Sequence, residues 1–117
     1  MRYFKELKVW QKGFRIAVNS FRITEGFPNQ EKFGLALQIN KAGVSIPSNI
    51  AEGSSRNSDK DYNRFMEISL GSCFELESQL FIAREVKYGN QTLIEVRLEL
   101  LAEEEKMLTS FSKTLTA

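Results

Sequence analysis

Residues 58–89, SDKDYNRFMEISLGSCFELESQLFIAREVKYG, carry the clearest heptad pattern of the chain. Apolar or small side chains recur there at alternating steps of four and three, at Tyr62, Met66, Ser69, Cys73, Leu76, Leu80 and Ala83. Such a stripe is typical of a helix that buries one face in a bundle. Ser58 is a favourable N-cap, and two aspartates follow it in the first turn, where they suit the helix dipole. We predict a long helix that begins at Ser58 and ends at Tyr88-Gly89.

Three more helices are predicted around this segment. A first helix ends at Gly26, and its core stripe is expected to be Tyr3, Leu7, Trp10, Phe14, Ala17 and Phe21. A second should run from about residue 30 to 52, after an N-cap at Asn29, and continue through Pro47. Thr92 and Glu95 form a capping box that opens a fourth. No segment alternates like a half-buried strand, so we predict an all-α, antiparallel up-down four-helix bundle, a single domain over residues 1–117.

Composition excludes several kinds of chemistry. The 117 residues include no histidine and one cysteine, Cys73, so histidine-based catalysis, histidine metal sites and an internal disulfide are impossible. No Glu-x-x-Glu pair occurs that could build a carboxylate metal site. No window is long and uncharged enough to span a membrane, and the opening residues lack the apolar region of a secretory signal. We expect a cytoplasmic protein that is not an enzyme and needs no metal or cofactor.

Basic side chains on the first predicted helix form a candidate nucleic-acid-binding stripe. They follow the stepping of one helical face, opposite the expected core stripe, and are Lys5, Lys8, Lys12, Arg15 and Arg22. Aligned cations over roughly 25 Å of helix suit successive phosphates of a nucleic-acid backbone. The alternative is an ordinary solvated face.

Apolar side chains outnumber what one small bundle needs to bury. The first and fourth predicted helices each carry a second apolar stripe, and the surplus residues are Val9, Ile16, Ile23, Ile94, Leu98 and Leu101. A contiguous apolar patch away from the core usually marks an interface. We predict a homo-oligomer that uses these residues, and its alternative is an irregular bundle in which a neighbouring segment covers them.

A polar cluster lies on one side of the second predicted helix. Its members are Gln38, Ser45, Asn49 and Glu52, with Arg56 placed to pair with Glu52. One interpretation makes Glu52 a catalytic acid or a metal ligand. The favoured interpretation is structural: Ser45 and Asn49 hydrogen-bond backbone that Pro47 frees, and Glu52 pairs with Arg56.

The same residues resemble a known bacterial family. The segments that carry the resemblance are FKELKVWQK at residues 4–12, FPNQEKFGL at 27–35, and above all AGVSIPSNIAEG at 42–53 with Arg56 after it. The chain is similar over about residues 4–110 to the four-helix-bundle proteins encoded by intervening sequences within bacterial 23S rRNA genes. These are often labelled small-subunit-series ribosomal proteins, and the accessory variability determinant of retroelements looks like a relative.

The resemblance implies a four-helix bundle that assembles into a cyclic pentamer and has no enzymatic activity. It also implies RNA or DNA as a ligand, in line with the basic stripe. An alternative function is a protein-interaction scaffold, in which the ring organises a partner enzyme without binding nucleic acid. In either case the repeated contacts of a ring would strengthen weak individual ones.

Overall fold

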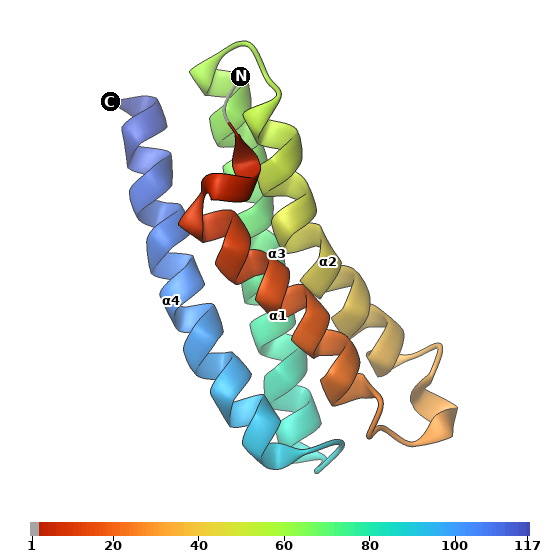
Figure 1. The fold of residues 1–117 in the computed structure, drawn as a ribbon. Coiled ribbons are helices and arrows are strands. Elements are labelled where there is room, and N and C mark those ends of the chain that lie inside the picture. Colours follow the sequence, from red (N-terminus) through yellow and green to blue (C-terminus); the bar gives the residue numbers. More distant parts are fainter. Residues whose placement is uncertain (1–2) are drawn as a thin grey trace.

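The computed structural model describes residues 3–117, and they form four α-helices and two short 3₁₀ turns. In chain order these are η1 (Phe4–Glu6), α1 (Lys8–Thr24), η2 (Asn29–Glu31), α2 (Leu35–Ser54), α3 (Asp59–Glu85) and α4 (Gln91–Thr116). Figure 1 shows consecutive helices running in opposite directions, with α1 between α2 and α4 and in front of α3. Each helix packs on its neighbours in the chain, and α4 packs back on α1. The predicted antiparallel up-down four-helix bundle is confirmed.

The helix ends follow side-chain capping, although not always by the expected residue. Ser58 caps α3 as predicted, because its hydroxyl accepts a hydrogen bond of 3.1 Å from the backbone N–H of Asp61. The prediction for α4 was wrong: Asn90 is the N-cap and accepts from the N–H of Leu93 at 3.0 Å, two residues before Thr92. Asparagine is as good a cap as threonine, so the two signals compete locally.

The first two α-helices begin later than the sequence pattern indicates. Leu7 is extended (φ −76°, ψ 126°), so the 3₁₀ turn that holds Lys5 is separated from α1. The predicted N-cap at Asn29 was also wrong, because a 3₁₀ turn occupies that position and α2 starts only after Gly34. The carboxylate of Glu31 accepts from the first N–H of α2 at 3.2 Å. As predicted, α2 continues through Pro47.

The buried face of α1 is not the predicted one. Val9, Ile16 and Ile23, which were assigned to an interface between copies, are at most 4% exposed within this single chain. Phe14 and Phe21, which were assigned to the core, are each 48% exposed. The inner face of α1 therefore consists of β-branched and small residues, and its aromatic residues lie at the edge of the bundle.

Close helix packing is the physical reason for this exchange. A Cβ atom on Gly13 would lie 3.1 Å from a methyl of Ile46, and one on Gly43 would lie 2.5 Å from the hydroxyl of Ser20. Helices this close leave room for glycine, serine and compact aliphatic side chains between them, but not for a phenylalanine ring.

The three α4 residues assigned to the interface are also core residues. Ile94 and Leu101 are fully buried and Leu98 is 9% exposed, all within the chain's own hydrophobic core. The second stripe of α4 is therefore its inward face, and the predicted interface set was wrong in every member. Among residues 3–117, every helix carries too many polar side chains along its length to span a lipid bilayer.

Candidate nucleic-acid interface

Three exposed cations follow one stripe of α1, and we call Lys8, Arg15 and Arg22 the basic shoulder. Lys12 lies on the same stripe, on the side of α4, where it contacts Glu103. Arg22, at the end of the stripe, also lines a groove between α1 and α2. The shoulder flanks the buried face of α1 and does not lie opposite it, because the core stripe itself is displaced from the predicted position. All three cations remain accessible to a ligand.

Lys12 differs from the three cations of the basic shoulder because a carboxylate of the same chain holds it. Its ammonium donates to a carboxylate oxygen of Glu103 at 2.8 Å, and its side chain is only 14% exposed. The hydrogen bond from Lys12, and then its charge, lower the pKa of the Glu103 carboxyl. The charge of Lys12 is therefore compensated within the chain, which makes it a poor phosphate contact.

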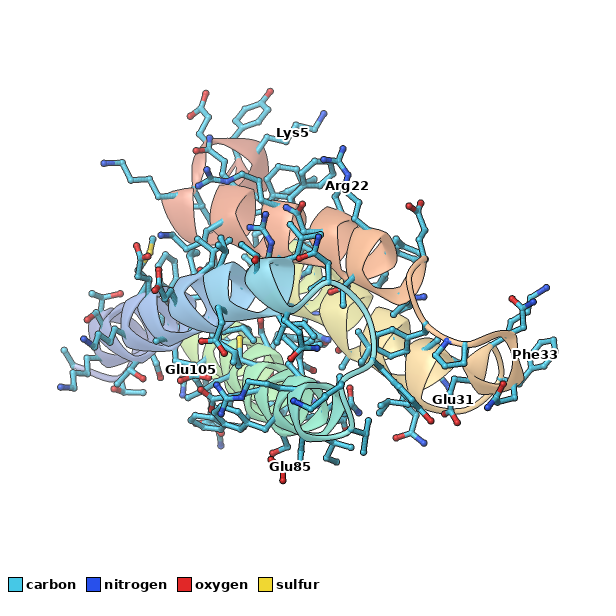
Figure 2. All side chains as sticks on the ribbon, turned by 90° about the horizontal axis from the view of Figure 1, so that it is seen from below. Lys5, Arg22, Glu31, Phe33, Glu85 and Glu105 are labelled. Carbon is cyan, nitrogen blue, oxygen red and sulfur yellow. The ribbon has the colours of Figure 1, made fainter. Side chains whose placement is uncertain are left out.

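Lys5 lies in the 3₁₀ turn and is exposed. The side-chain amide of Gln11 donates to the carbonyl of Lys5 at 2.9 Å and so ties this turn to α1. Figure 2 shows Lys5, in the 3₁₀ turn, and Arg22 of α1 on one side of the bundle, whereas Glu85 projects from the opposite side. The molecule is thus electrostatically two-sided, with cations along α1 and carboxylates on α3.

Arg97 of α4 was missed by the sequence analysis. It lies on the inward-facing stripe of α4, and it is half-buried, with a buried Nε atom that has no hydrogen-bond partner in the described chain. Burial lowers the pKa of its guanidinium, and the charges of Arg15 and Arg22 lower it further. An arginine at an apolar heptad position is the signal that could have identified it.

Glu104 is the second charged residue at an inward position of α4. It is fully buried, and neither carboxylate oxygen has a hydrogen-bond partner among residues 3–117. The site lies against α1, since a Cβ on Gly13 would be 2.9 Å from its Oε2. Burial raises the pKa of Glu104 to about 8, against the opposing charges of Lys12 and Arg15. The carboxyl is therefore largely protonated and neutral at pH 7.

Cys73 lies in the same core and is a structural residue. It is fully buried, and burial raises the pKa of its thiol, with further contributions from Glu104, Glu105 and Glu77. Burial, then the charge and hydrogen bonding of Glu77, also raise the pKa of Glu105 to about 7. A buried thiol with a raised pKa is a weak nucleophile. Among residues 3–117, no three His, Cys, Asp or Glu side chains gather as they would around a metal ion.

The polar cluster of α2 joins this helix to α3. The hydroxyls of Ser45 and Ser72 are 2.8 Å apart, and the Asn49 amide donates to the carbonyl and the hydroxyl of Ser45 at 2.8 and 2.9 Å. Fully buried Ser69 of α3 donates to the carbonyl of Ile46 at 2.9 Å. These bonds hold the turn of α2 around Pro47, although none of them reaches the carbonyl of Gly43, which loses its partner to the proline.

Glu52 and Arg56 form the expected ion pair, with 2.7 Å between carboxylate oxygen and guanidinium nitrogen. The guanidinium of Arg56 also lies over the ring of Phe65, 4.7 Å from its centroid. Gln38 is exposed and takes no part in the hydrogen bonds of the cluster. This arrangement suits a structural motif that fixes the turn between α2 and α3, and it gives Glu52 no catalytic partner.

Exposed apolar side chains line a groove between α1 and α2. The groove has a volume of about 450 Å³, and its apolar walls come from Phe14, Ala17, Val18, Phe21, Val44 and Pro47. A second groove of about 520 Å³ adjoins it and shares Phe21 and Val44. We call the two grooves together the α1–α2 groove. It is an exposed apolar surface that is available for an interface, whereas the residues predicted for that role are buried.

Comparisons with known proteins agree with the fold. Residues 5–110 match the family described as 23S rRNA-intervening sequence protein. A solved crystal structure is similar, with a TM-score of 0.82 and 27% identity over 90% of this chain and 98% of the other. It is a protein of unknown function from the S23 ribosomal protein family, from Bacteroides thetaiotaomicron VPI-5482. No curated protein matches the chain.

Proposed function

The chain belongs to the family of 23S rRNA-intervening sequence proteins, and from this premise we propose that it binds RNA or DNA as a homo-oligomer, without catalysing a reaction. The basic shoulder of α1 is the contact surface in this proposal, and the α1–α2 groove is the contact between copies. Phosphate contacts of this kind confer affinity and salt dependence but no sequence preference.

The observation that carries the proposal is that the cations of the basic shoulder form no ion pair within residues 3–117. Lys8 and Arg22 are 14 residues apart, which places them about 21 Å from each other along α1. Arg15 lies midway between them, and all three are exposed, whereas the adjacent Lys12 is held by Glu103. A row of free cations over this length fits the regular charge of a polynucleotide backbone.

The proposed partner on the α1–α2 groove is a second copy of this chain. Charge supports this choice: residues 1–60 hold ten basic and five acidic side chains, whereas residues 61–117 hold six and ten. A copy that presents its acidic α3–α4 half to the α1–α2 half of its neighbour makes a head-to-tail contact, and such contacts form a ring when the rotation between neighbours closes. We propose the cyclic pentamer that the resemblance implies, in which five basic shoulders act together.

A charge-reversal variant tests the nucleic-acid proposal. The double variant Lys8→Glu/Arg22→Glu should bind a structured RNA at least tenfold more weakly at low salt, because two phosphate contacts become repulsive. The slope of log affinity against log salt should also become shallower by about 1 to 2. Fluorescence anisotropy over a salt series measures both quantities.

A matched control separates these positions from net charge. Lys32→Glu/Lys60→Glu makes the same change in charge at exposed positions off the shoulder, and it should leave most of the affinity intact. Wild-type protein that does not bind RNA or DNA at low salt would overturn the proposal. That result, together with a ring that keeps a protein partner after nuclease treatment, would favour the scaffold function instead.

A further inference from the structure

Arg97 of α4 lies near Arg15 and Arg22 of α1, and within residues 3–117 none of the three forms an ion pair. Contacts between α1 and α4 fix the positions of these arginines along the helix axes. Lys12 pairs with Glu103, Gly13 lies against Glu104, and just beyond the helix ends Gly26 lies against Gly89. Since the two helices are antiparallel, each step forward on α1 matches a step back on α4. Arg97 is therefore level with Asn19, between Arg15 and Arg22, one turn from each.

Arg97 is anchored by its own helix. Its Nε atom is buried while the residue as a whole is only half-buried, and the charges of Arg15 and Arg22 act on its guanidinium. Holding a cation in a partly apolar seam beside two other cations costs stability unless an anion completes the site.

The neighbouring carboxylates do not supply that anion. Glu95 is committed to Arg84 of α3 at 2.9 Å, and Glu103 is committed to Lys12. Glu104 faces Arg15 from α4, but it is fully buried, and its raised pKa keeps it largely neutral at pH 7. Glu25 follows Arg22 by three residues and is exposed at the end of α1, but within residues 3–117 it forms no ion pair with Arg22.

We propose that Arg15, Arg22 and Arg97 together bind one phosphate group, and that this group is a phosphodiester of the nucleic-acid backbone. The inference rests on the proposed function and gives it a specific site. Guanidinium groups bind phosphate oxygens bidentately, and three of them around one group make a geometrically selective contact. Each hydrogen bond from Arg97 contributes more binding free energy than one from Arg15 or Arg22, because the buried stem of Arg97 is already ordered before the ligand arrives.

The variant Arg97→Met gives a test with two opposite signals. Its affinity for a 12-nucleotide oligouridylate should fall about tenfold at low salt, since charged hydrogen bonds are lost. Its thermal midpoint should rise, because methionine fills the seam and the repulsion among three cations is relieved. An arginine with only a structural role would give the reverse result, a lower midpoint with unchanged affinity, and that result would overturn the inference.

Two further variants keep the test decisive. Arg15→Gln, at an exposed position where folding is not at risk, should also lose about tenfold in affinity. Arg64→Met, which removes an exposed arginine from α3, should leave affinity unchanged. If wild-type protein binds the oligonucleotide and both Arg97→Met and Arg15→Gln bind it equally well, the three-arginine site is wrong while the proposed function stands.

Inorganic phosphate distinguishes the remaining outcomes. Phosphate at millimolar concentration should raise the thermal midpoint of the wild type and have a smaller effect on Arg97→Met. If phosphate does so but the oligonucleotide does not bind, the three arginines hold a free phosphate compound and the proposed function is wrong. If neither ligand has an effect, both the site and the proposed function are overturned.

Discussion

Glu104 shows how one residue can couple the stability of the bundle to pH. Its pKa rises from an ordinary value of 4.5 in the unfolded chain to about 8 in the folded one. The folded state therefore holds a proton that the unfolded state has already lost between these two values. The resulting stabilisation is complete below about pH 4.5 and is lost as the pH rises through about 8.

We predict that Glu104→Met removes this dependence and stabilises the protein at alkaline pH. The wild type should lose unfolding free energy between about pH 5 and 8, at a rate approaching 1.4 kcal/mol per pH unit, and the variant much less. Urea denaturation at pH 5 and pH 8.5 measures the difference.

The charged groups around Glu104 define the controls. Lys12 and Arg15 approach it from α1, Cys73 lies on α3, and Glu105, whose pKa is raised to about 7, lies next to it on α4. Glu105 accounts for a smaller loss in the same pH range, which should persist in Glu104→Met. Glu99→Gln, at an exposed position of α4, should behave as the wild type does. Equal pH profiles for Glu104→Met and the wild type would contradict the prediction.

At the scale of the helices, glycine positions decide how closely α1 can approach α2. Gly43 faces Ser20 and Ala17 of α1, where an added Cβ would lie 2.5 Å from a hydroxyl that itself donates to the carbonyl of Ile16. Gly71, in the middle of α3, has nothing within 4 Å of its missing Cβ. Both glycines lie near the middle of their helices, but Gly43 is in close contact with a neighbouring helix and Gly71 is not.

This contrast predicts opposite signs for one substitution. Gly71→Ala should stabilise the protein by about 0.5–1 kcal/mol, because alanine is the better helix former and meets no neighbour. Gly43→Ala should destabilise it by about 1–3 kcal/mol, because overpacking forces α1 away from α2. Chemical denaturation of the two variants side by side is the measurement, and stabilisation by both would refute the close packing of α1 on α2.

At the scale of the whole molecule, apolar residues that do not fit inside the bundle are concentrated on particular faces. The α1–α2 groove is bordered by an aromatic contact between Trp10 and Phe14, whose rings stack with centroids 5.3 Å apart. Exposed apolar side chains also occur on α3, among them Phe74 and Phe81, and Figure 2 shows Phe33 at the far end of the molecule. In the proposed head-to-tail assembly the α1–α2 groove supplies one of the two faces in contact.

We predict that Val18→Asp/Val44→Asp converts the proposed ring into monomers without unfolding it. Both side chains are exposed in the groove, at 37% and 43%, so the monomer tolerates the change while a docked copy would have to bury two carboxylates. Native mass spectrometry gives the stoichiometry, and circular dichroism checks the helix content. Phe33→Asp, at an exposed position outside the groove, should keep the wild-type assembly. A wild-type protein that is monomeric at micromolar concentration would count against the whole assembly proposal.

The sequence by itself determined the number, order and type of the helices. Periodic apolar positions, a serine cap at residue 58 and short polar turns are local signals, and they specify an up-down bundle without knowledge of the final contacts. The ion pair between Glu52 and Arg56 was also predictable, because Arg56 follows Glu52 by four residues at the end of α2.

Only the tertiary structure decided which face of α1 is buried and which cations remain free. Two stripes on α1 have helical period, and hydrophobicity alone favours the aromatic one, whereas close packing selects Val9, Ile16 and Ile23. The same rotation brings Lys12 to Glu103 and sets Arg97 between Arg15 and Arg22. Periodicity defines a helical face but not its neighbour; the fit of side-chain volumes between helices makes that choice, and it exists only once the helices have docked.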